Sequence, residues 1–374
     1  MANGGAPKGG RPNGTRGVSA RDRLNIVVLM GGTSSERDVS LASGIRIAEA
    51  LRSCGHTVRA VDPARGEIGA DEQRTLAAGG VVQVVPPSQE SLRQMAREAL
   101  PRLASNLPRR GDADVVFLGL HGGSGEDGTI QAMLELTGVP YTGSNTLASA
   151  LAMDKDLSKV LFRQAGVTTA DWVMAPASVS AVRSAIGFPA VVKPSKQGST
   201  VGLSVVKDPA GLQDAIDEAF DFDDEVMIER FIPGRELTVG ILGGEALPVG
   251  EIIPRHEIYD YECKYTAGMA EERFPAELSA SESARVQDEA RKAFAALKLR
   301  GYARIDFRMA SDGTFYCLEA NTLPGMTHTS LIPQAAAAAG ITFPALCERI
   351  VQLALEAHAR PDGRSDAAGH GVRA

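Results

Sequence analysis

Short apolar runs alternate with helical patterns over the first third of the chain. Residues 26–30 form an apolar run that ends at two glycines, which predicts a buried strand. A helix over about 34–53, capped by one of its first serines, is expected next, with further strands over 57–62 and 114–120. Strands that alternate with helices indicate a parallel sheet covered on both faces. Residues 24–144 are therefore predicted to form an N-terminal α/β domain.

Hairpins replace this alternation in the next part of the chain. Predicted strands over 189–194 and 201–206 flank a polar glycine-containing loop at 195–200. A P-loop or a dinucleotide site would need a helix after its glycine loop, whereas this loop leads into a second strand. The loop is therefore expected to be a hairpin flap, and residues 145–229 are predicted to form a central subdomain.

The last large segment, residues 230–358, is predicted to form a C-terminal subdomain. It begins with strands and continues into a polar, Tyr-rich stretch over 255–273. A stretch of that length is long for a loop, so it is expected to be a lid or, alternatively, a plain surface loop held by its aromatic residues. Residues 1–23 and 359–374 are polar and rich in Gly and Arg, and they are predicted to be disordered tails.

Composition excludes several classes of protein. The formal net charge is −7, whereas nucleic-acid binders normally carry a basic footprint, so no nucleic-acid partner is expected. No apolar run approaches the ~18 residues of a membrane-spanning helix. The four cysteines are widely spaced, with no CxxC pair, which fits a cytoplasmic protein better than a disulfide framework or a zinc site.

The last hairpin carries the most informative chemistry. An Asp-Gly pair at 312–313 is a strong signal for a two-residue turn, which would place Asp306 opposite Glu319 and Arg304 opposite Asn321. Directly opposed β-carbons lie about 5 Å apart, and like charges there are destabilising. Two facing carboxylates beside an amide oxygen are expected to hold a hard cation such as Mg²⁺, shared with phosphate. The plainer alternative is a pair of acids on a solvated sheet face.

Two lysines lie where an anion would explain them. Lys193 ends an apolar strand directly before the flap, and Lys155 lies at a predicted helix start. Either lysine alone is more often solvated. Together with the flap and the acidic hairpin, they indicate a clamp for a nucleoside triphosphate.

The N-terminal domain offers polar residues at the carboxyl ends of its strands, where open α/β sheets bind ligands. Glu36 lies in the first turn of a helix and His121 ends another strand. A lone Glu there commonly compensates the helix dipole, and a lone His is commonly a satisfied polar residue at the sheet edge. Together they suggest an amino-acid substrate, and Lys264 and Tyr265 of the long loop are expected to close over it.

Several motifs, in order and spacing, resemble one family. They are GGTSSERDVSL, LHGGSGEDGTIQAMLEL, PYTGS, MDK, VVKPSKQGSTVG, YECKY, RIDF and LEANTLPGMTHTSL. From about residue 25 to about residue 355 the chain resembles the D-alanine–D-alanine ligases of the ATP-grasp superfamily. The resemblance implies an α/β fold of three domains with ATP held between two antiparallel sheets. It also implies that ATP phosphorylates one D-alanine and that the amine of a second attacks the acylphosphate, for peptidoglycan precursor synthesis.

The same resemblance assigns roles to individual residues. Those implied at the reacting centre are Glu36, Ser199, Tyr265, Arg304 and the N–H of Gly325, with His121 nearby and Ser330 and Leu331 at the second D-alanine. Those implied around ATP are Lys155, Lys193, Glu229, Phe231, Ile232, Glu236 and Lys264. Those implied to bind two Mg²⁺, with Mn²⁺ as an alternative ion, are Asp306, Glu319 and Asn321.

Other second substrates and other classes of function fit the sequence less well. Relatives that use D-lactate change the position of Tyr265, so its presence favours D-alanine over D-lactate or D-serine as the second substrate. A non-catalytic nucleotide-binding module would be expected to lack a metal ligand or Arg304, and a dehydrogenase would need a dinucleotide fingerprint. The resemblance also implies a homodimer formed through the N-terminal domain.

Overall fold

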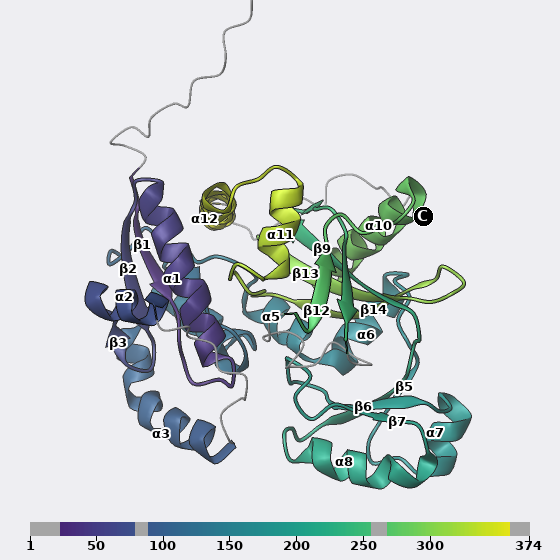
Figure 1. Ribbon diagram of the computed structural model, residues 1–374. Helices are drawn as coiled ribbons and strands as arrows, with labels where there is room; N and C mark the ends of the chain where they lie inside the picture. Colours follow the sequence, from purple (N-terminus) through teal and green to yellow (C-terminus); the bar gives the residue numbers. More distant parts are fainter. Residues whose placement is uncertain (1–22, 79–88, 256–267, 360–374) are drawn as a thin grey trace, which may run out of the picture.

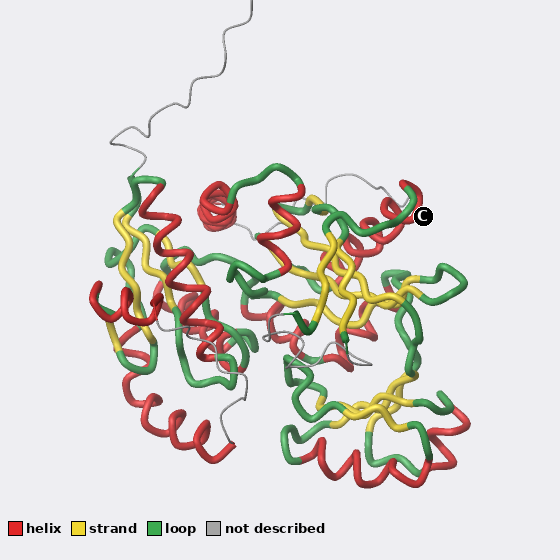
Figure 2. The backbone as a smooth tube through the Cα atoms, in the orientation of Figure 1, coloured by secondary structure: helices red, strands yellow, loops and turns green. Residues whose placement is uncertain are grey.

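A computed structural model describes residues 23–78, 89–255 and 268–359. The two predicted tails, apart from Arg23 and Ala359, and most of the predicted lid, with Lys264 and Tyr265, lie outside the described residues. The chain folds into three α/β units, which are the N-terminal domain, the central subdomain and the C-terminal subdomain (Figure 1). Figure 2 shows that each group of strands has helices on its outer side.

The N-terminal domain is built on a four-stranded sheet in the order β3-β2-β1-β4. Strands β1 (Asn25–Leu29), β2 (Thr57–Asp62) and β4 (Val115–Leu118) are parallel, as the alternating pattern predicts, and β3 (Gly66–Glu67) is an antiparallel edge. The helices are α1 (Arg37–Ser53), α2 (Ala70–Ala78), α3 (Gln89–Asn106) and α4 (Thr129–Thr137), with a 3₁₀ turn at Gly123–Gly125.

The predicted serine cap of the first helix is wrong. The N-cap of α1 is Glu36, without a side-chain capping bond. Ser34 is unavailable because its hydroxyl donates to the carbonyl of His121 and accepts from the N–H of Glu36. The glutamate is thereby placed at the helix start, at the carboxyl end of the sheet.

The central subdomain holds an antiparallel sheet in the order β5-β8-β6-β7. Its strands are β5 (Trp172–Met174), β6 (Ala190–Pro194), β7 (Ser204–Val206) and β8 (Val226–Arg230), covered by α7 (Val179–Ala185) and α8 (Leu212–Phe220) with a 3₁₀ turn at Pro209–Gly211. The strand-loop-strand prediction for the flap is confirmed, because β6 and β7 pair directly.

The C-terminal subdomain holds a six-stranded antiparallel sheet with the path β12-β11-β9-β13-β14, and β10 pairs with β9. Its elements are β9 (Arg235–Leu242), β10 (Glu245–Ala246), β11 (Gly250–Pro254), β12 (Ala270–Arg273), α10 (Ala280–Ala296), β13 (Tyr302–Met309), β14 (Phe315–Asn321), α11 (Leu331–Ala338) and α12 (Phe343–Ala359). The long loop predicted over 255–273 ends earlier, because residues 270–273 pair with β11.

Packing mixes segments that are separate along the chain. Helices α5 (Thr146–Met153) and α6 (Lys155–Gln164) belong by sequence to the central subdomain, but Ala148 and Phe162 pack in the core of the six-stranded sheet. The two helices are separate because Asp154 ends α5 and caps α6. In the same way α11 and α12 share a core with the N-terminal domain.

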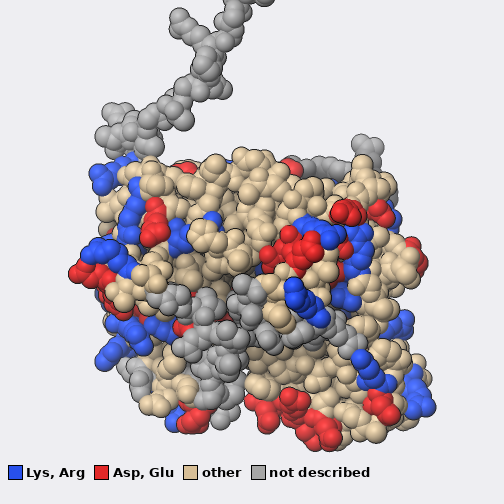
Figure 3. Space-filling view, viewed as in Figure 1, with Lys and Arg blue, Asp and Glu red and all other residues tan. Residues whose placement is uncertain are grey.

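No single helix of the described segments is long and apolar enough to cross a membrane. The pair α11 and α12 passes that test together, but the two are bent by 104°. Both helices contribute buried residues to the core shared with the N-terminal domain. On the face shown in Figure 3, basic and acidic side chains are interspersed.

Candidate active site: two adjoining pockets

A pocket lies between the two antiparallel sheets and is here called the sheet pocket. It encloses about 1000 Å³, open solvent included. Strands β6 and β8 form one wall, β9, β13 and β14 the other, and the flap residues 197–201 lie along one side. The predicted residues that line it are Lys155, Lys193, Ser199, Glu229, Phe231, Ile232, Glu236, Arg304, Asp306, Glu319 and Leu331.

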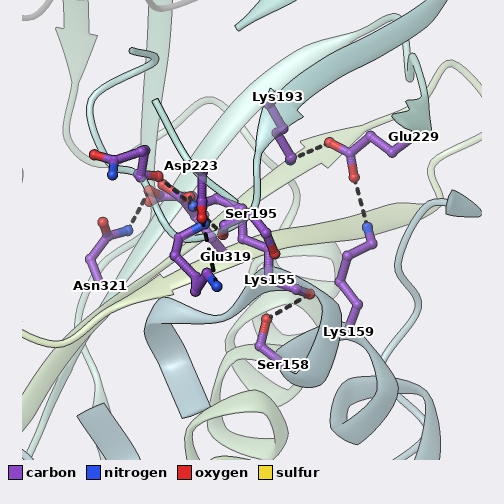
Figure 4. Close-up of polar contacts among 12 residues, drawn as sticks. Lys155, Ser158, Lys159, Lys193, Ser195, Asp223, Glu229, Glu319 and Asn321 are labelled. Atoms are coloured by element: carbon purple, nitrogen blue, oxygen red, sulfur yellow. Dashed lines mark hydrogen bonds and ion pairs between the residues drawn. The ribbon is translucent and has the colours of Figure 1, made fainter. Parts of the chain in front are cut away.

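One buried carboxylate organises the β8 wall. Glu229 is 3% exposed and is bonded by Lys193 and, at 2.8 Å, by Lys159 (Figure 4). Burial alone would raise the pKa of Glu229, but the two lysines outweigh it and lower that pKa to about 2. Sequence reasoning missed Lys159, although it follows Lys155 by four residues and therefore lies on the same side of α6.

Lys155 is the first residue of α6, as predicted, and it faces the flap. Its Nζ donates to the carbonyl of Gln197 at 2.7 Å and lies 3.4 Å from the carboxylate of Glu319. Its backbone N–H donates to the carbonyl of Ser195 at 3.3 Å. This ammonium, at a helix N-terminus and beside the pocket, is suited to an anionic ligand.

The end of the pocket near residues 231–236 contains a cation that the sequence did not single out. Arg308 on β13 donates to the carbonyl of Ile232 at 3.1 Å and to Glu236 at 3.1 Å. Its guanidinium also lies 5.8 Å from the centre of the Phe231 ring. Arg308 therefore fixes the short segment after β8 that links the two sheets.

The acidic hairpin has the predicted register at the site but a different turn. Asp306 lies opposite Glu319 and Arg304 opposite Asn321. The turn predicted at residues 312–313 is wrong, because residues 311–313 form a three-residue loop with Gly313 in the left-handed region (φ 78°). That loop alone would set the register one residue off.

A β-bulge between Asp306 and Phe307 restores the alignment. The extra residue on β14 is Leu318, and it lines the sheet pocket together with Glu319, while Cys317 and Ala320 are buried in the core. A bulge of this kind re-aims the side chains beside it. Two consecutive residues thus face one pocket.

Both hairpin acids are paired with cations. Asp306 is 8% exposed and accepts from the Nε and Nη2 of Arg304 at 2.8–3.1 Å, from Thr238 at 2.7 Å and from the amide of Asn321 at 3.0 Å. Glu319 has Lys155 beside it. The repulsion that the sequence suggested is therefore offset within the protein.

The donor set fits a divalent ion shared with a ligand. In the part of the chain that the structure describes, no three His, Cys, Asp or Glu side chains gather as a closed metal site. The hairpin offers two carboxylates and an amide at the edge of a pocket. Such an incomplete set of oxygen donors suits Mg²⁺ completed by phosphate oxygens and water.

A second pocket, here called the loop pocket, adjoins the first. It encloses about 720 Å³, open solvent included, between the N-terminal domain, the flap and residues 321–331. The predicted residues that line it are Glu36, His121, Ser199, Arg304, Asn321, Gly325, Ser330 and Leu331. Ser199, Arg304 and Leu331 line both pockets, so the two meet there.

The flap reaches across to the N-terminal domain. Ser199 and Thr200 both have positive φ values, 51° and 62°, which non-glycine residues rarely adopt. The hydroxyl of Ser199 donates to Glu36 Oε1. This contact joins the flap to the start of α1 and closes one side of the loop pocket.

The loop pocket is acidic on the side of the N-terminal domain. Glu126, which sequence reasoning did not single out although it lies in the HGGSGEDG motif, lines the pocket with Glu36. Burial raises the pKa of Glu126, and the nearby charge of Glu36 adds to the increase. Two carboxyl groups at this wall favour a cationic group on the ligand, such as an ammonium.

His121 uses both ring nitrogens within the protein. Nδ1 lies 2.9 Å from the carbonyl of Leu323, so it must donate, and Nε2 lies 2.9 Å from the hydroxyl of Ser43. That hydroxyl also accepts from the N–H of Met326 at 3.1 Å. The sequence placed His121 beside a substrate, and the structure adds that the ring holds residues 323–326.

The opposite wall of the loop pocket is a loop followed by a helix start. Arg46 on α1 donates to the carbonyls of Met326 at 2.9 Å and Thr327 at 2.6 Å. Ser330 is the N-cap of α11, and its hydroxyl accepts from the N–H of Thr327 at 2.9 Å. A Cβ at Gly325 would lie 2.6 Å from that hydroxyl, so a larger residue there would displace the Ser330 side chain. A helix N-terminus here suits a carboxylate.

Comparison with known proteins agrees over most of the chain. Residues 25–144 match the family model "D-ala D-ala ligase N-terminus", and residues 153–352 match "D-ala D-ala ligase C-terminus". The chain is 44% identical over 337 residues to a D-alanine–D-alanine ligase of Geobacter sulfurreducens, covering 88% of this chain and 95% of the relative. It is 41% identical over 326 residues to one of Syntrophotalea carbinolica, covering 87% and 94%.

Solved structures give the same answer. A D-alanine–D-alanine ligase of Bacillus anthracis has a TM-score of 0.71 and 34% identity, with 90% of this chain and 99% of that chain covered. A D-alanine–D-alanine ligase of Bacillus anthracis in complex with ATP has a TM-score of 0.68 and 32% identity, with 90% of this chain and 98% of that chain covered.

Proposed function

The chain belongs to the D-alanine–D-alanine ligase family, and we propose that it divides the family's reaction between its two pockets. The reaction is the ATP-dependent joining of two D-alanines, which supplies a dipeptide for peptidoglycan synthesis. The observation that carries the division is that the sheet pocket and the loop pocket meet at Ser199 and Arg304. A group transferred from one ligand to the other has to pass such a junction.

ATP occupies the sheet pocket. Its base lies towards Glu229, Phe231 and Ile232, and its ribose towards Glu236, all of which line that pocket. Its phosphates lie towards Lys155 and Lys193, and Lys264 of the lid is assigned to them on the resemblance alone. This orientation directs the terminal phosphate to the junction.

Magnesium is assigned to the acidic hairpin. Asp306, Glu319 and Asn321 would hold it, as two ions on the family resemblance. When bound, the metal supplies positive charge that screens the phosphates and favours loss of ADP. Arg304 and Lys155 already lie against these carboxylates and hold them in place.

The first D-alanine lies in the loop pocket with its ammonium towards Glu36. The carboxyl side of the second is assigned to Ser330 and the N-terminus of α11. Glu126 lines the same wall, and Ser199 keeps Glu36 oriented. Tyr265 completes the set with Glu36 and Ser199 on the family resemblance.

The chemistry proceeds in two steps. A carboxylate oxygen of the first D-alanine attacks the terminal phosphorus of ATP, and ADP leaves with the electrons of the broken P–O bond. The amine of the second D-alanine, after losing a proton, attacks the acyl carbon, and phosphate leaves as the C–O bond breaks. Negative charge develops on the carbonyl oxygen, where Arg304 and the N–H of Gly325 can stabilise it.

Excluding water is the other requirement, because an acylphosphate hydrolyses. The flap contact between Ser199 and Glu36 covers the junction from one side. The lid is assigned to the other side. Holding two small substrates in line supplies much of the rate.

The test is product formation from ATP with D-alanine alone and with D-alanine plus D-lactate or D-serine. We expect D-alanyl-D-alanine and one phosphate released per dipeptide. Phosphate release that appears only with D-lactate or D-serine would reassign the second substrate. No phosphate release with any of them would reject the ligase assignment.

We also propose a homodimer formed through the N-terminal domain, working in the cytoplasm where ATP is available. Leu136 at the end of α4 is 90% exposed, which supports a covered surface there. Sedimentation should give a dimer, and Leu136→Glu should give a monomer. A monomeric unmodified protein would contradict this assignment.

A further inference from the structure

Lys159 is a buried ammonium that the reaction above does not use. Its side chain is fully buried on α6, one turn after Lys155. Its Nζ donates to Glu229 Oε2 at 2.8 Å and to the hydroxyl of Thr169 at 2.7 Å, and it lies 5.2 Å from the centre of the Trp172 ring. Burial lowers the pKa of Lys159, partly offset by the charge of Glu229.

The two lysines on Glu229 are not equivalent. Figure 4 shows Glu229 between them, with one oxygen towards Lys193 and the other towards Lys159. Lys193 lines the sheet pocket, whereas Lys159 is not among the lining residues. A nucleotide can therefore draw Lys193 away from Glu229, while Lys159 stays where it is.

Removing the last cation from a buried carboxylate is strongly unfavourable. With Lys159 in place, Glu229 keeps a partner after Lys193 turns to the phosphates, and its Oε1 becomes available as an acceptor. Without Lys159, Lys193 would be held on Glu229, and the carboxylate and the phosphates would compete for one ammonium.

We propose that Lys159 is a positioning residue for the nucleotide: it holds the Glu229 carboxylate so that Lys193 can move to the phosphates and Glu229 can accept from an amino group on the base. This rests on the proposed placement of ATP in the sheet pocket. Guanine carries a carbonyl oxygen where adenine carries its amino group, and the fixed Glu229 carboxylate would repel that oxygen. The Lys159–Glu229 pair therefore also favours adenine over guanine.

The anchoring extends to the opposite wall of the pocket. Thr169, which accepts from Lys159, donates to the carbonyl of Cys317 at 2.7 Å, and the N–H of Cys317 donates to the carbonyl of Thr168 at 2.8 Å. Cys317 precedes Leu318, the extra residue of the bulge. Lys159 is therefore tied to the strand that carries Glu319, and it cannot follow Lys193.

The experiment compares Lys159→Met with Arg163→Met, a control one turn further along α6 whose guanidinium is half-exposed. Trp172 is the single tryptophan of the chain and lies opposite Glu229 in the β5–β8 pairing, so its fluorescence can report nucleotide binding. We expect Lys159→Met to raise the Kd and the KM for ATP roughly tenfold or more, with the KM values for D-alanine changed less than about twofold. Arg163→Met should change neither.

A double variant separates positioning from packing. Lys159→Met with Glu229→Gln removes the buried charge and frees Lys193, and it should fold because neither partner is left as an unpaired ion. Its ATP affinity should return to that of Glu229→Gln alone. Losses that add up in the double variant, or an unchanged Kd in Lys159→Met, would overturn the proposal.

Failure of the proposed ligase function can be distinguished from failure of the role proposed for Lys159. If the unmodified protein binds ATP by Trp172 fluorescence but forms no dipeptide, the ligase assignment fails while the binding comparison still tests Lys159. GTP supplies a further check, since the ratio of GTP to ATP affinity should rise in Lys159→Met and stay constant in Arg163→Met.

Discussion

The sheet pocket and the loop pocket are held together by different forces. The sheet pocket is lined by neighbouring strands, and its buried charges are matched in pairs, such as Glu229 with Lys159. The loop pocket is assembled from loops of the N-terminal domain and of both subdomains. It depends on hydrogen bonds between segments far apart in sequence, such as that from Arg46 to the carbonyl of Met326. The difference indicates that the sheet pocket forms as soon as the two antiparallel sheets pack together. The loop pocket forms only when the N-terminal domain has also packed against both subdomains.

The largest effect should come from the acids of the sheet pocket. Asp306→Asn and Glu319→Gln should each lower turnover by about 10²–10³-fold, because a fixed charge of the reacting centre is lost. Melting temperatures should not rise, because Arg304 and Lys155 already offset the repulsion. Asp312→Asn at the exposed tip of the same hairpin is the control for phosphate release, and normal turnover in both site variants would remove the hairpin from the reaction.

The second-largest effect is expected at Ser199, where the two pockets meet. Ser199→Ala deletes a hydrogen bond to the charged Glu36, and such bonds contribute about 1.5–3 kcal/mol, which is about 10- to 150-fold in kcat/KM. The loss should appear in the D-alanine dependence, while ATP binding followed by Trp172 fluorescence stays the same. An equal loss of ATP affinity would mean that the flap serves the sheet pocket first.

A smaller effect is expected at the far side of the loop pocket. Arg46→Gln removes the bonds to the carbonyls of Met326 and Thr327 and should raise the KM for the second D-alanine by roughly tenfold or less, with the KM for ATP unchanged. Arg52→Gln, near the exposed end of the same helix, is the matched control. Parallel changes in both KM values would show that the two pockets are not separable.

The smallest effect should be on stability alone. The pKa of Glu126 is raised by burial, so the folded protein binds its proton more tightly than the unfolded chain does. The resulting stabilisation is present below the unfolded pKa and is lost as the pH rises through the folded pKa. The melting temperature of Glu126→Gln, relative to that of the unmodified protein, should therefore be higher at alkaline pH than at acidic pH. An equal difference at both pH values would contradict this.

The same contrast explains what sequence could predict. The strand pairing of Asp306 with Glu319 is set between residues close along the chain, and the register at the site was predicted correctly although the turn was not. Lys159 and Arg308 were missed because a lysine on a helix or an arginine on a strand gives no sign of the distant acid that pairs with it. Glu126 lay inside a recognised motif, but its burial depends on the packing of the other layers.

The loop pocket was the less predictable of the two. The residues implied by resemblance do gather there, including Glu36, Ser199 and Ser330. What holds them could not be foreseen, because the contacts of Arg46 and of His121 with residues 323–327 join segments about 200 to 280 residues apart. Short-range patterns of polar and apolar residues do not encode such contacts.

The bulge at Leu318 has a consequence for engineering this hairpin. Since the alignment of Asp306 with Glu319 is re-set at the bulge, the tip at residues 311–313 can be exchanged for another three-residue loop without turning either acid away. Deleting Leu318 would make the ladder regular and would also keep Glu319 opposite Asp306, because Glu319 would then directly follow the core residue Cys317. The deletion would remove only the second pocket-facing side chain, and a label or peptide graft belongs at the exposed tip.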